Sequence, residues 1–115
     1  MTQCKDNIKL RHMLEHSREA VKLAEGKSRK DLDSDRKMEL ALTRLVEIIG
    51  EAAARVSNQT QNGYSEIPWS EIIGLRNRLI HGYDAVDMDI LWEIIQVDLP
   101  GLIADLDIII KELRE

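Results

Sequence analysis

Apolar residues recur along most of this chain at intervals of three and four, which is the spacing of one face of an α-helix. The clearest run is Met38, Leu42, Leu45, Ile49, Ala52 and Val56. It predicts one long helix, capped by Asp33 or Ser34 and buried against nearly antiparallel neighbours. Gly50 within it costs about 1 kcal/mol relative to alanine, and indicates either close approach of another helix or simple tolerance.

Residue spacing and composition also predict the elements on either side of this helix. Residues 6–24 place Leu10, Met13, Leu14, Val21 and Ala24 near one stripe, which predicts a helix that ends at Gly26. A polar and charged connector is expected over residues 27–33. Residues 58–66 contain Asn62-Gly63 and are expected to form a loop.

The C-terminal half of the chain predicts two or three more helices. Pro68 suits the first turn of a helix that runs to about Ile80 and stops at Gly82. Asp87 is placed to cap the next helix, which Pro100 breaks or kinks ahead of a last apolar segment. No stretch alternates as a half-buried strand does. We therefore expect one all-α domain over residues 1–115, an up-and-down bundle of four to five helices.

Composition fits a helical, globular and cytoplasmic protein. The 115 residues are 43% hydrophobic and include no Phe, two Trp and two Tyr, so the core is expected to be aliphatic, with Trp69 and Trp92 in it or at an interface. No stretch approaches the roughly 20 apolar residues of a membrane span, and we expect no signal peptide. The single cysteine, Cys4, cannot form an internal disulfide, which fits a reducing compartment.

The net charge of −5 is unevenly distributed along the chain. Residues 84–115 carry nine acidic and two basic side chains, whereas residues 1–83 are slightly basic. This balance argues against a protein that coats nucleic acid, because phosphate contacts need a concentrated positive field. A small basic cleft stays compatible with it. The basic-rich stretch 27–37 either extends a nucleic-acid groove or is only a hydrated surface.

Two spacings that suggest metal ligands are incomplete. His12 and His16 share a helix face, but two imidazoles do not complete a site, and a solvated helix surface is the simpler interpretation. The aspartates over residues 31–35 open like a calcium loop, yet the glycine and the closing glutamate of such a loop are missing. We expect no metal ion.

The densest group of reactive side chains lies over residues 75–83, with the sequence Leu-Arg-Asn-Arg-Leu-Ile-His-Gly-Tyr. Asn77 and His81 are four apart and share a face while the helix lasts, whereas Arg76 and His81 diverge unless the helix unwinds. In the simplest interpretation, Arg76 and Arg78 are surface charges and His81 sits at the helix C-terminus, where a cation is favoured.

The same residues also suit cleavage of RNA without a metal. Attack of a ribose 2′-hydroxyl on the adjacent phosphate needs a base, an acid and positive charge for the developing phosphorane. Histidine transfers protons near neutral pH, and arginine supplies a permanent charge in a planar fork that matches phosphate oxygens. Asn77 would orient His81 or bind phosphate. Because each chain carries one such histidine, a symmetric homodimer that pools two copies in one cleft would be chemically sensible.

Several motifs together resemble the HEPN superfamily and its HepT toxins. Arg76-Asn77, three residues and then His81 resemble the R-x4-6-H signature, and the extension to Tyr83 resembles the R-x4-H-x-Y motif of HepT. The similarity extends over roughly residues 11–110. It includes the stretches Ile48-Ile49-Gly50-Glu51-Ala52, Ile67-Pro68-Trp69, Ile72–Asn77, Trp92-Glu93-Ile94 and Asp98-Leu99-Pro100.

The resemblance implies an all-α, homodimeric endoribonuclease toxin that needs no metal. Arg76 and His81 would be catalytic near the dimer interface, with Asn77 assisting, while Arg78 would contact RNA or a partner or remain solvated. The family's usual partner is an MNT-type nucleotidyltransferase antitoxin, which would neutralise the toxin by transferring AMP from ATP to Tyr83. A nucleotide at that position would place negative charge and bulk where the RNA phosphate must bind.

A second interpretation belongs to another class of protein. The bundle would be a non-catalytic subunit of a nucleotidyltransferase complex, and the cluster over residues 76–83 would bind a nucleotide or a partner. The two interpretations separate on RNA cleavage that is lost in Arg76→Ala or His81→Ala variants.

Overall fold

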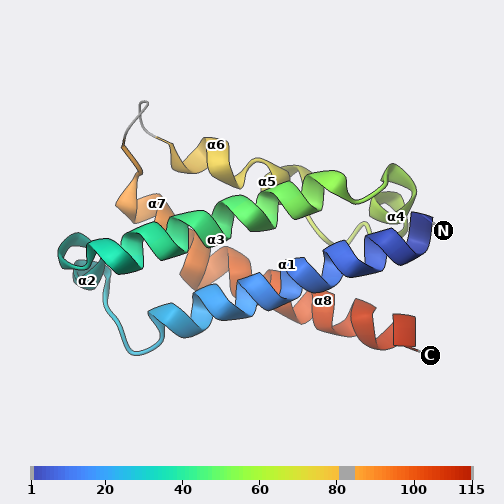
Figure 1. Cartoon of the computed structure of the whole chain (residues 1–115), viewed down its shortest axis with the longest axis horizontal. Coiled ribbons are helices and arrows are strands. Elements are labelled where there is room, and N and C mark those ends of the chain that lie inside the picture. The colour runs from blue at the N-terminus through green and yellow to red at the C-terminus, as the bar shows by residue number, and fades with distance from the viewer. Residues whose placement is uncertain (1, 81–84, 115) are drawn as a thin grey trace.

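The computed structural model describes residues 2–80 and 85–114 and confirms the all-α bundle. Its two long helices, α1 (Thr2–Ala24) and α3 (Arg36–Arg55), lie side by side, and α8 (Leu99–Arg114) packs against α1 (Figure 1). Two short helices, α5 (Trp69–Ile73) and α6 (Leu75–Leu79), run along the edge of α3 that is opposite α1 in this view. Helix α6 carries three residues of the expected site, Arg76, Asn77 and Arg78.

The pattern that predicts α3 matches its burial. Met38, Leu42, Leu45, Ile49 and Val56 are buried, and Ala52 is half-buried against the same core. The cap is Asp35 instead of the predicted Asp33 or Ser34, and its carboxylate accepts a hydrogen bond from the backbone N–H of Met38 at 3.0 Å. The displacement has a simple reason, because Asp33 and Ser34 belong to the preceding helix.

Gly50 lies where α3 passes the backbone of α5. A Cβ atom at this position would stand 3.2 Å from the carbonyl oxygen of Ile72, which is tighter than an ordinary contact. Of the two explanations for this glycine, close approach is therefore confirmed. The missing side chain lets the segment that leads into α6 lie directly against α3.

Two short helices occupy stretches that the sequence assigns to a connector and a loop. Helix α2 (Arg29–Ser34) is capped by Ser28, whose N–H donates to the Asp31 carboxylate at 2.7 Å, and its one buried residue is Leu32. Helix α4 (Asn58–Gly63) is capped by Ser57, whose hydroxyl accepts from the N–H of Thr60 at 3.2 Å. These expectations are wrong because a six-residue helix stabilised by its caps shows no hydrophobic period.

The third predicted helix is divided. Helix α5 ends at Ile73, Gly74 separates it from α6, and α6 ends at Leu79, within one residue of the predicted end at about Ile80. The expected stop at Gly82 lies outside the described residues. Pro68 precedes α5 as its cap residue instead of standing in its first turn. The break at Gly74 turns α6 so that it packs against both α3 and α7 (Met88–Glu93).

The C-terminal helices form one continuous run instead of breaking at Pro100. Asp87 caps α7 as predicted, accepting from the N–H of Ile90 at 3.1 Å. A π-helical turn, η1 (Ile94–Asp98), then joins α7 to α8. The wider turn comes just before Pro100, which has no N–H for the regular helical bond, so the chain continues without a stop.

The core is aliphatic, as the composition predicts. Both tryptophans contribute to it, since Trp69 is buried, with its indole N–H donating to the carbonyl of Tyr64 at 3.0 Å, and Trp92 packs at the margin. In residues 2–80 and 85–114, no helix has both the length and the hydrophobicity that crossing a membrane requires.

Candidate functional site

A groove of about 250 Å³ lies where the N-terminal half of α3 meets the end of α6. Helix α3 contributes Leu40 and Glu47 to its wall, and α6 contributes Arg76. Ile80 and Ala85, which flank residues 81–84, also line it. We call this the Arg76 groove. The residues immediately before and after segment 81–84 therefore both lie at this groove.

The chain is closed into a narrow neck on either side of residues 81–84. Ile80 and Val86 form an antiparallel bridge, and the N–H of Asp87 donates to the carbonyl of Leu79 at 2.9 Å. The predicted catalytic His81 and the predicted modification site Tyr83 lie outside the described residues. The neck fixes where this segment begins and ends, at the rim of the Arg76 groove.

Arg76 is held by a carboxylate from another helix. Its Nε donates to Oε2 of Glu47 at 3.0 Å, and Glu47 also lies 3.8 Å from Arg44. The Arg76 side chain is 58% exposed, and its terminal nitrogens make no hydrogen bond to any residue that the structure describes. Glu47 thus fixes the direction of the guanidinium while the edge that suits a phosphate stays open to solvent.

Arg78 and Asn77 are placed differently from Arg76. The Nη2 of Arg78 donates to Asp98 at 2.6 Å and lies 3.6 Å from Glu93, so this arginine is directed toward the C-terminal helices. Asn77 is exposed, and neither residue lines the Arg76 groove. Because α6 ends at Leu79, helical spacing does not carry the shared face from Asn77 on to His81.

Two residues of this groove are not found by reasoning from the sequence. Glu47 precedes Arg76 by 29 positions, and nothing in its local pattern marks it as a partner. Thr43 also lines the groove, and its hydroxyl is buried without a hydrogen-bond partner among the described residues. The groove has an apolar rim as well, where Leu40 is 52% exposed and Ile80 is 40% exposed.

The spacings that suggest metal ligands have ordinary roles. In the described part of the chain, no three His, Cys, Asp or Glu side chains are grouped as metal ligands would be. The rings of His12 and His16 lie 6.2 Å apart, and Nδ1 of His16 is 3.4 Å from Glu19. The aspartates of residues 31–35 cap helices or pair with Arg29.

The basic-rich stretch 27–37 is partly neutralised. Arg29 donates to Asp33 at 3.0 Å and to Asp89 at 2.8 Å, and these hydrogen bonds raise the pKa of Arg29 above its ordinary value. Arg36 pairs with Glu39 at 3.0 Å. These pairs remove much of the positive field that a nucleic-acid groove along this stretch would need.

Comparison with known proteins gives one consistent result. The family model described as Ribonuclease HepT-like matches residues 13–109. A Thermococcus cleftensis protein named "Probable ribonuclease HepT" is 39% identical over 93 residues, which cover 77% of this chain and 84% of that protein. A Caldanaerobacter subterraneus protein named "Putative RNase" is 36% identical over 93 residues, covering 81% and 83%. No solved structure matches the chain.

Proposed function

This chain belongs to the HepT-like ribonuclease family, and we propose that it is a cytoplasmic, metal-independent endoribonuclease toxin that uses Arg76 and His81. The Arg76 groove is the observation that carries the proposal. Its arginine is oriented by Glu47 and stands beside Ile80 and Ala85, the two residues that flank the segment containing His81.

The proposed reaction is transfer within the RNA strand. The ribose 2′-oxygen forms a bond to the adjacent phosphorus, and the bond from phosphorus to the 5′-oxygen of the next nucleotide breaks. His81 accepts the proton of the 2′-hydroxyl, and a second imidazolium donates a proton to the leaving 5′-oxygen. The terminal nitrogens of Arg76 stabilise the charge that develops on the phosphorane, and Asn77 assists by orienting His81 or binding phosphate.

A homodimer supplies the second imidazolium. The exposed side chains of Leu40 and Ile80 beside Arg76 support this part of the proposal, because removing an apolar rim from water beneath a second copy stabilises the dimer. Ile108 is 60% exposed, on the surface that α8 presents. Sedimentation tests the dimer, and a Leu40→Glu variant is expected to be monomeric. The same variant is expected to be inactive in RNA cleavage, because the proposed shared cleft is at this rim.

We propose an MNT-type nucleotidyltransferase as the antitoxin. The phenolic oxygen of Tyr83 attacks the α-phosphorus of ATP, pyrophosphate leaves, and the phenolic proton passes to a base of the antitoxin or to solvent. The added AMP carries negative charge at the entrance of the Arg76 groove and repels RNA. A Tyr83→Phe variant is expected to gain no AMP, by intact mass, and to remain active in the presence of antitoxin and ATP.

The test of the nuclease proposal is a substrate that lacks the nucleophile. An RNA oligonucleotide that the wild-type protein cleaves is resynthesised with a single 2′-deoxyribose on the 5′ side of the cleaved bond. We expect the modified strand to stay intact at that bond and the parent strand to be cut. Cleavage of the deoxy-substituted bond would overturn the mechanism. If the wild-type protein cleaves no RNA oligonucleotide at all, the non-catalytic binding subunit is favoured.

A further inference from the structure

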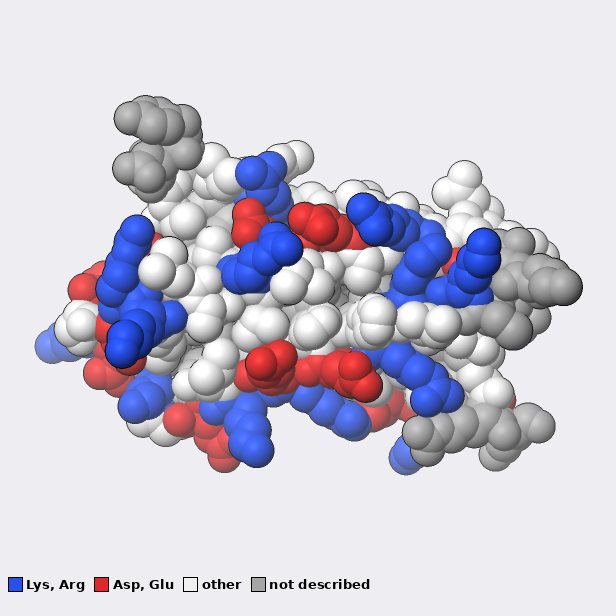
Figure 2. Space-filling model, viewed as in Figure 1, with Lys and Arg blue, Asp and Glu red and all other residues white. Residues whose placement is uncertain are grey.

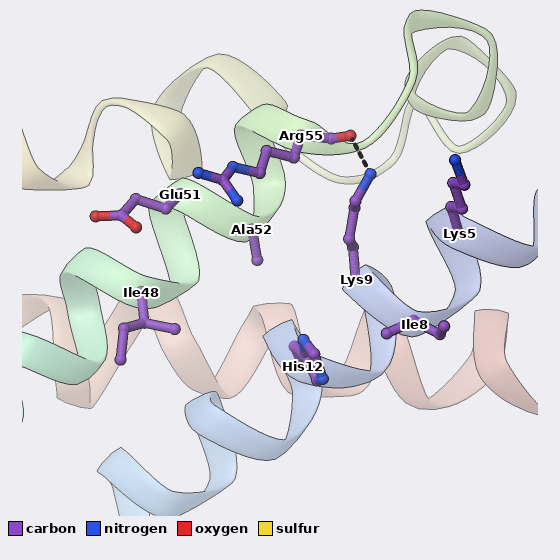
Figure 3. A pocket seen from close by; sticks show the side chains of 8 residues that line it. All are labelled: Lys5, Ile8, Lys9, His12, Ile48, Glu51, Ala52 and Arg55. Carbon is purple, nitrogen blue, oxygen red and sulfur yellow. Dashed lines mark hydrogen bonds between the residues drawn. The ribbon is translucent and has the colours of Figure 1, made fainter. Parts of the chain in front are cut away.

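A second groove, with a volume of about 380 Å³, lies between the N-terminal half of α1 and the C-terminal half of α3. Ile8 and His12 of α1 face Ile48 and Ala52 of α3 across it (Figure 3). The other residues that line it are Lys5, Lys9, Glu51 and Arg55. We call it the cationic groove. No residue of this groove belongs to the motif recognised in the sequence.

Positive charge is concentrated at one end of this groove. Lys5, Lys9 and Arg55 form no ion pair with any residue in the part of the chain that the structure describes. The Lys9 ammonium group donates to the backbone carbonyl of Arg55 at 3.0 Å, which ties it across the groove. In Figure 2, basic side chains gather over this end of α1 and α3.

The single carboxylate that lines the groove lies apart from the two lysines. Glu51 stands on the other side of Arg55 from Lys5 and Lys9, and it is 3.9 Å from Arg44 (Figure 3). With His12 counted as neutral, the side chains that line the groove sum to +2, and the buried carboxylate of Asp6, which interacts with Lys9, reduces the local charge to +1 in a chain whose net charge is −5. This surface therefore attracts anions although the whole protein does not.

The floor of the groove is apolar and open to solvent. Ile8 is 55% exposed, Ile48 and Ala52 are half-buried, and the exposed imidazole of His12 lies between them. A nucleotide has the matching division, with an anionic phosphate at one end and the flat faces of sugar and base at the other. Single-stranded nucleic acid is bound in this way by many proteins, through a basic groove and a surface on which bases stack.

The cationic groove and the Arg76 groove lie along the same helix. Glu47, which holds Arg76, immediately precedes Ile48, which lines the cationic groove. Arg55 follows Glu47 by eight residues, or about 12 Å along the axis of α3. Figure 2 shows a largely uncharged band along α1 and α3 between the charged side chains. Along α3, the position that holds Arg76 and the far end of the cationic groove are therefore only about two helical turns apart.

We propose that the cationic groove binds the phosphodiester backbone of single-stranded RNA, next to the segment of the strand that enters the Arg76 groove. Lys5, Lys9 and Arg55 contact phosphates, and the apolar floor with His12 contacts sugar and base. The inference rests on the proposed ribonuclease function, since it concerns the same substrate. It assigns affinity for longer RNA to residues that take no part in the bond cleavage.

The experiment measures binding of a fluorescent single-stranded RNA of about 12 nucleotides that carries 2′-O-methyl groups and cannot be cleaved. The variant is Lys5→Gln/Arg55→Gln, whose side chains are exposed and hold no ion pair among the described residues. We expect Kd to rise about tenfold, and the slope of log Kd against log salt to fall by about 1.4, for two lost phosphate contacts. The control Lys111→Gln, an exposed lysine on α8, is expected to change neither quantity.

Further arms decide between the possible occupants. Lys5→Arg/Arg55→Lys keeps both charges and is expected to restore the wild-type Kd, which excludes loss of folding as the cause. An unchanged Kd and salt slope in the glutamine variant would overturn the proposal. So would a changed oligomeric state with unchanged RNA binding, which would assign the groove to a protein interface.

A free nucleotide carries the same phosphate and base as RNA and is the remaining alternative ligand for the cationic groove. AMP or inorganic phosphate that binds wild-type protein as tightly as the oligonucleotide would overturn the RNA assignment. Because the probe cannot be cleaved, this result is independent of the nuclease reaction. If neither wild-type protein nor variant cuts any RNA, the proposed function fails while the binding result still decides the cationic groove.

Discussion

The two grooves along α3 differ in how their positive charges are held. In the Arg76 groove, each arginine has a carboxylate, since Arg76 pairs with Glu47 and Arg36 with Glu39. In the cationic groove, Lys5 and Arg55 have no acidic partner among the described residues. The ion pairs of the Arg76 groove fix the direction of the arginine side chains. In the cationic groove, the charged groups of Lys5 and Arg55 are solvated and available to a ligand.

This difference suits two different tasks. A group that stabilises a transition state must already be oriented when charge develops, because reorientation costs part of the gain. A group that attracts a polyanion needs only available charge, and its effect is screened by salt. Substitutions along α3 should therefore affect turnover at one end and salt-dependent affinity at the other.

The largest effect is expected from Arg76→Ala. Loss of one oriented donor at the phosphorane is expected to lower kcat for RNA cleavage about 10²- to 10³-fold. Glu47→Gln, which keeps the arginine but weakens its anchor, is expected to give a smaller loss in kcat. Single-turnover cleavage rates measure both. An Arg76→Ala variant with wild-type kcat would remove Arg76 from the reaction.

Asp6 connects α1 to the start of α4, close to the end of α3, and supports the cationic groove. Its buried carboxylate accepts hydrogen bonds from the hydroxyls of Ser57 at 2.6 Å and Thr60 at 2.5 Å. Burial acts to raise the pKa of Asp6, but hydrogen bonds from Ser57 and Thr60 outweigh it and hold that pKa below its ordinary value. Asp6→Asn is expected to lower the free energy of unfolding by about 2 kcal/mol at neutral pH.

The pH dependence of that loss has a definite sign. A carboxyl whose pKa is lower in the folded than in the unfolded chain stabilises fully above its unfolded pKa, and the stabilisation disappears as the pH falls through the folded value. The difference between wild-type protein and Asp6→Asn in urea unfolding should therefore shrink below about pH 4. Glu112→Gln, at an exposed position with no ion pair among the described residues, is the control, and an equal loss at all pH values for Asp6→Asn would contradict the assignment.

Gly50 tests how firmly α3 positions the segment that carries Arg76. Alanine there gains about 1 kcal/mol of helix propensity but presses on the Ile72 carbonyl, and overpacking costs about 1–3 kcal/mol. We expect Gly50→Ala to lower the free energy of unfolding by about 1 kcal/mol net and to reduce cleavage more than binding to the cationic groove. Gly63→Ala, with no neighbour within 4 Å, is the matched control and is expected not to destabilise.

The smallest effect is expected from Arg78→Ala. This arginine pairs with Asp98 and Glu93 at the surface, and exposed ion pairs contribute about 0–1 kcal/mol. A free-energy change within that range corresponds to less than about fivefold in a rate or binding constant at 25 °C. Cleavage and RNA affinity are therefore each expected to change by less than about fivefold. Parallel measurement with Arg76→Ala gives the contrast. A loss as large as that of Arg76→Ala would show that Arg78 leaves its acidic partners to act on RNA.

Much of the fold can be predicted from local spacing. The apolar stripes of α1 and α3 and the cap at Asp87 are recovered because each depends on residues within one helix. Helices α2 and α4 are not, since they are too short to show a period. The break at Gly74 and the π-helical turn before Pro100 depend on packing and on backbone hydrogen bonds, which composition does not reveal.

The candidate site divides in the same way. Arg76, Asn77 and Arg78 can be found from the sequence because they are close together in it, and His81 and Tyr83 stay predictions. The ion pair of Arg76 with Glu47 and the meeting of Lys9 with Arg55 join residues 29 and 46 positions apart. Only the packing of α3 against α6 and α1 brings these pairs together, so no local sequence pattern predicts them.

The most direct test of the ribonuclease account uses purified chain whose mass shows an unmodified Tyr83. The protein is incubated with total RNA in EDTA, beside a His81→Ala variant prepared in the same way. The account predicts that wild-type protein cleaves RNA without metal and that the variant leaves it intact. Intact RNA with unmodified wild-type protein, or equal cleavage by the variant, would contradict it.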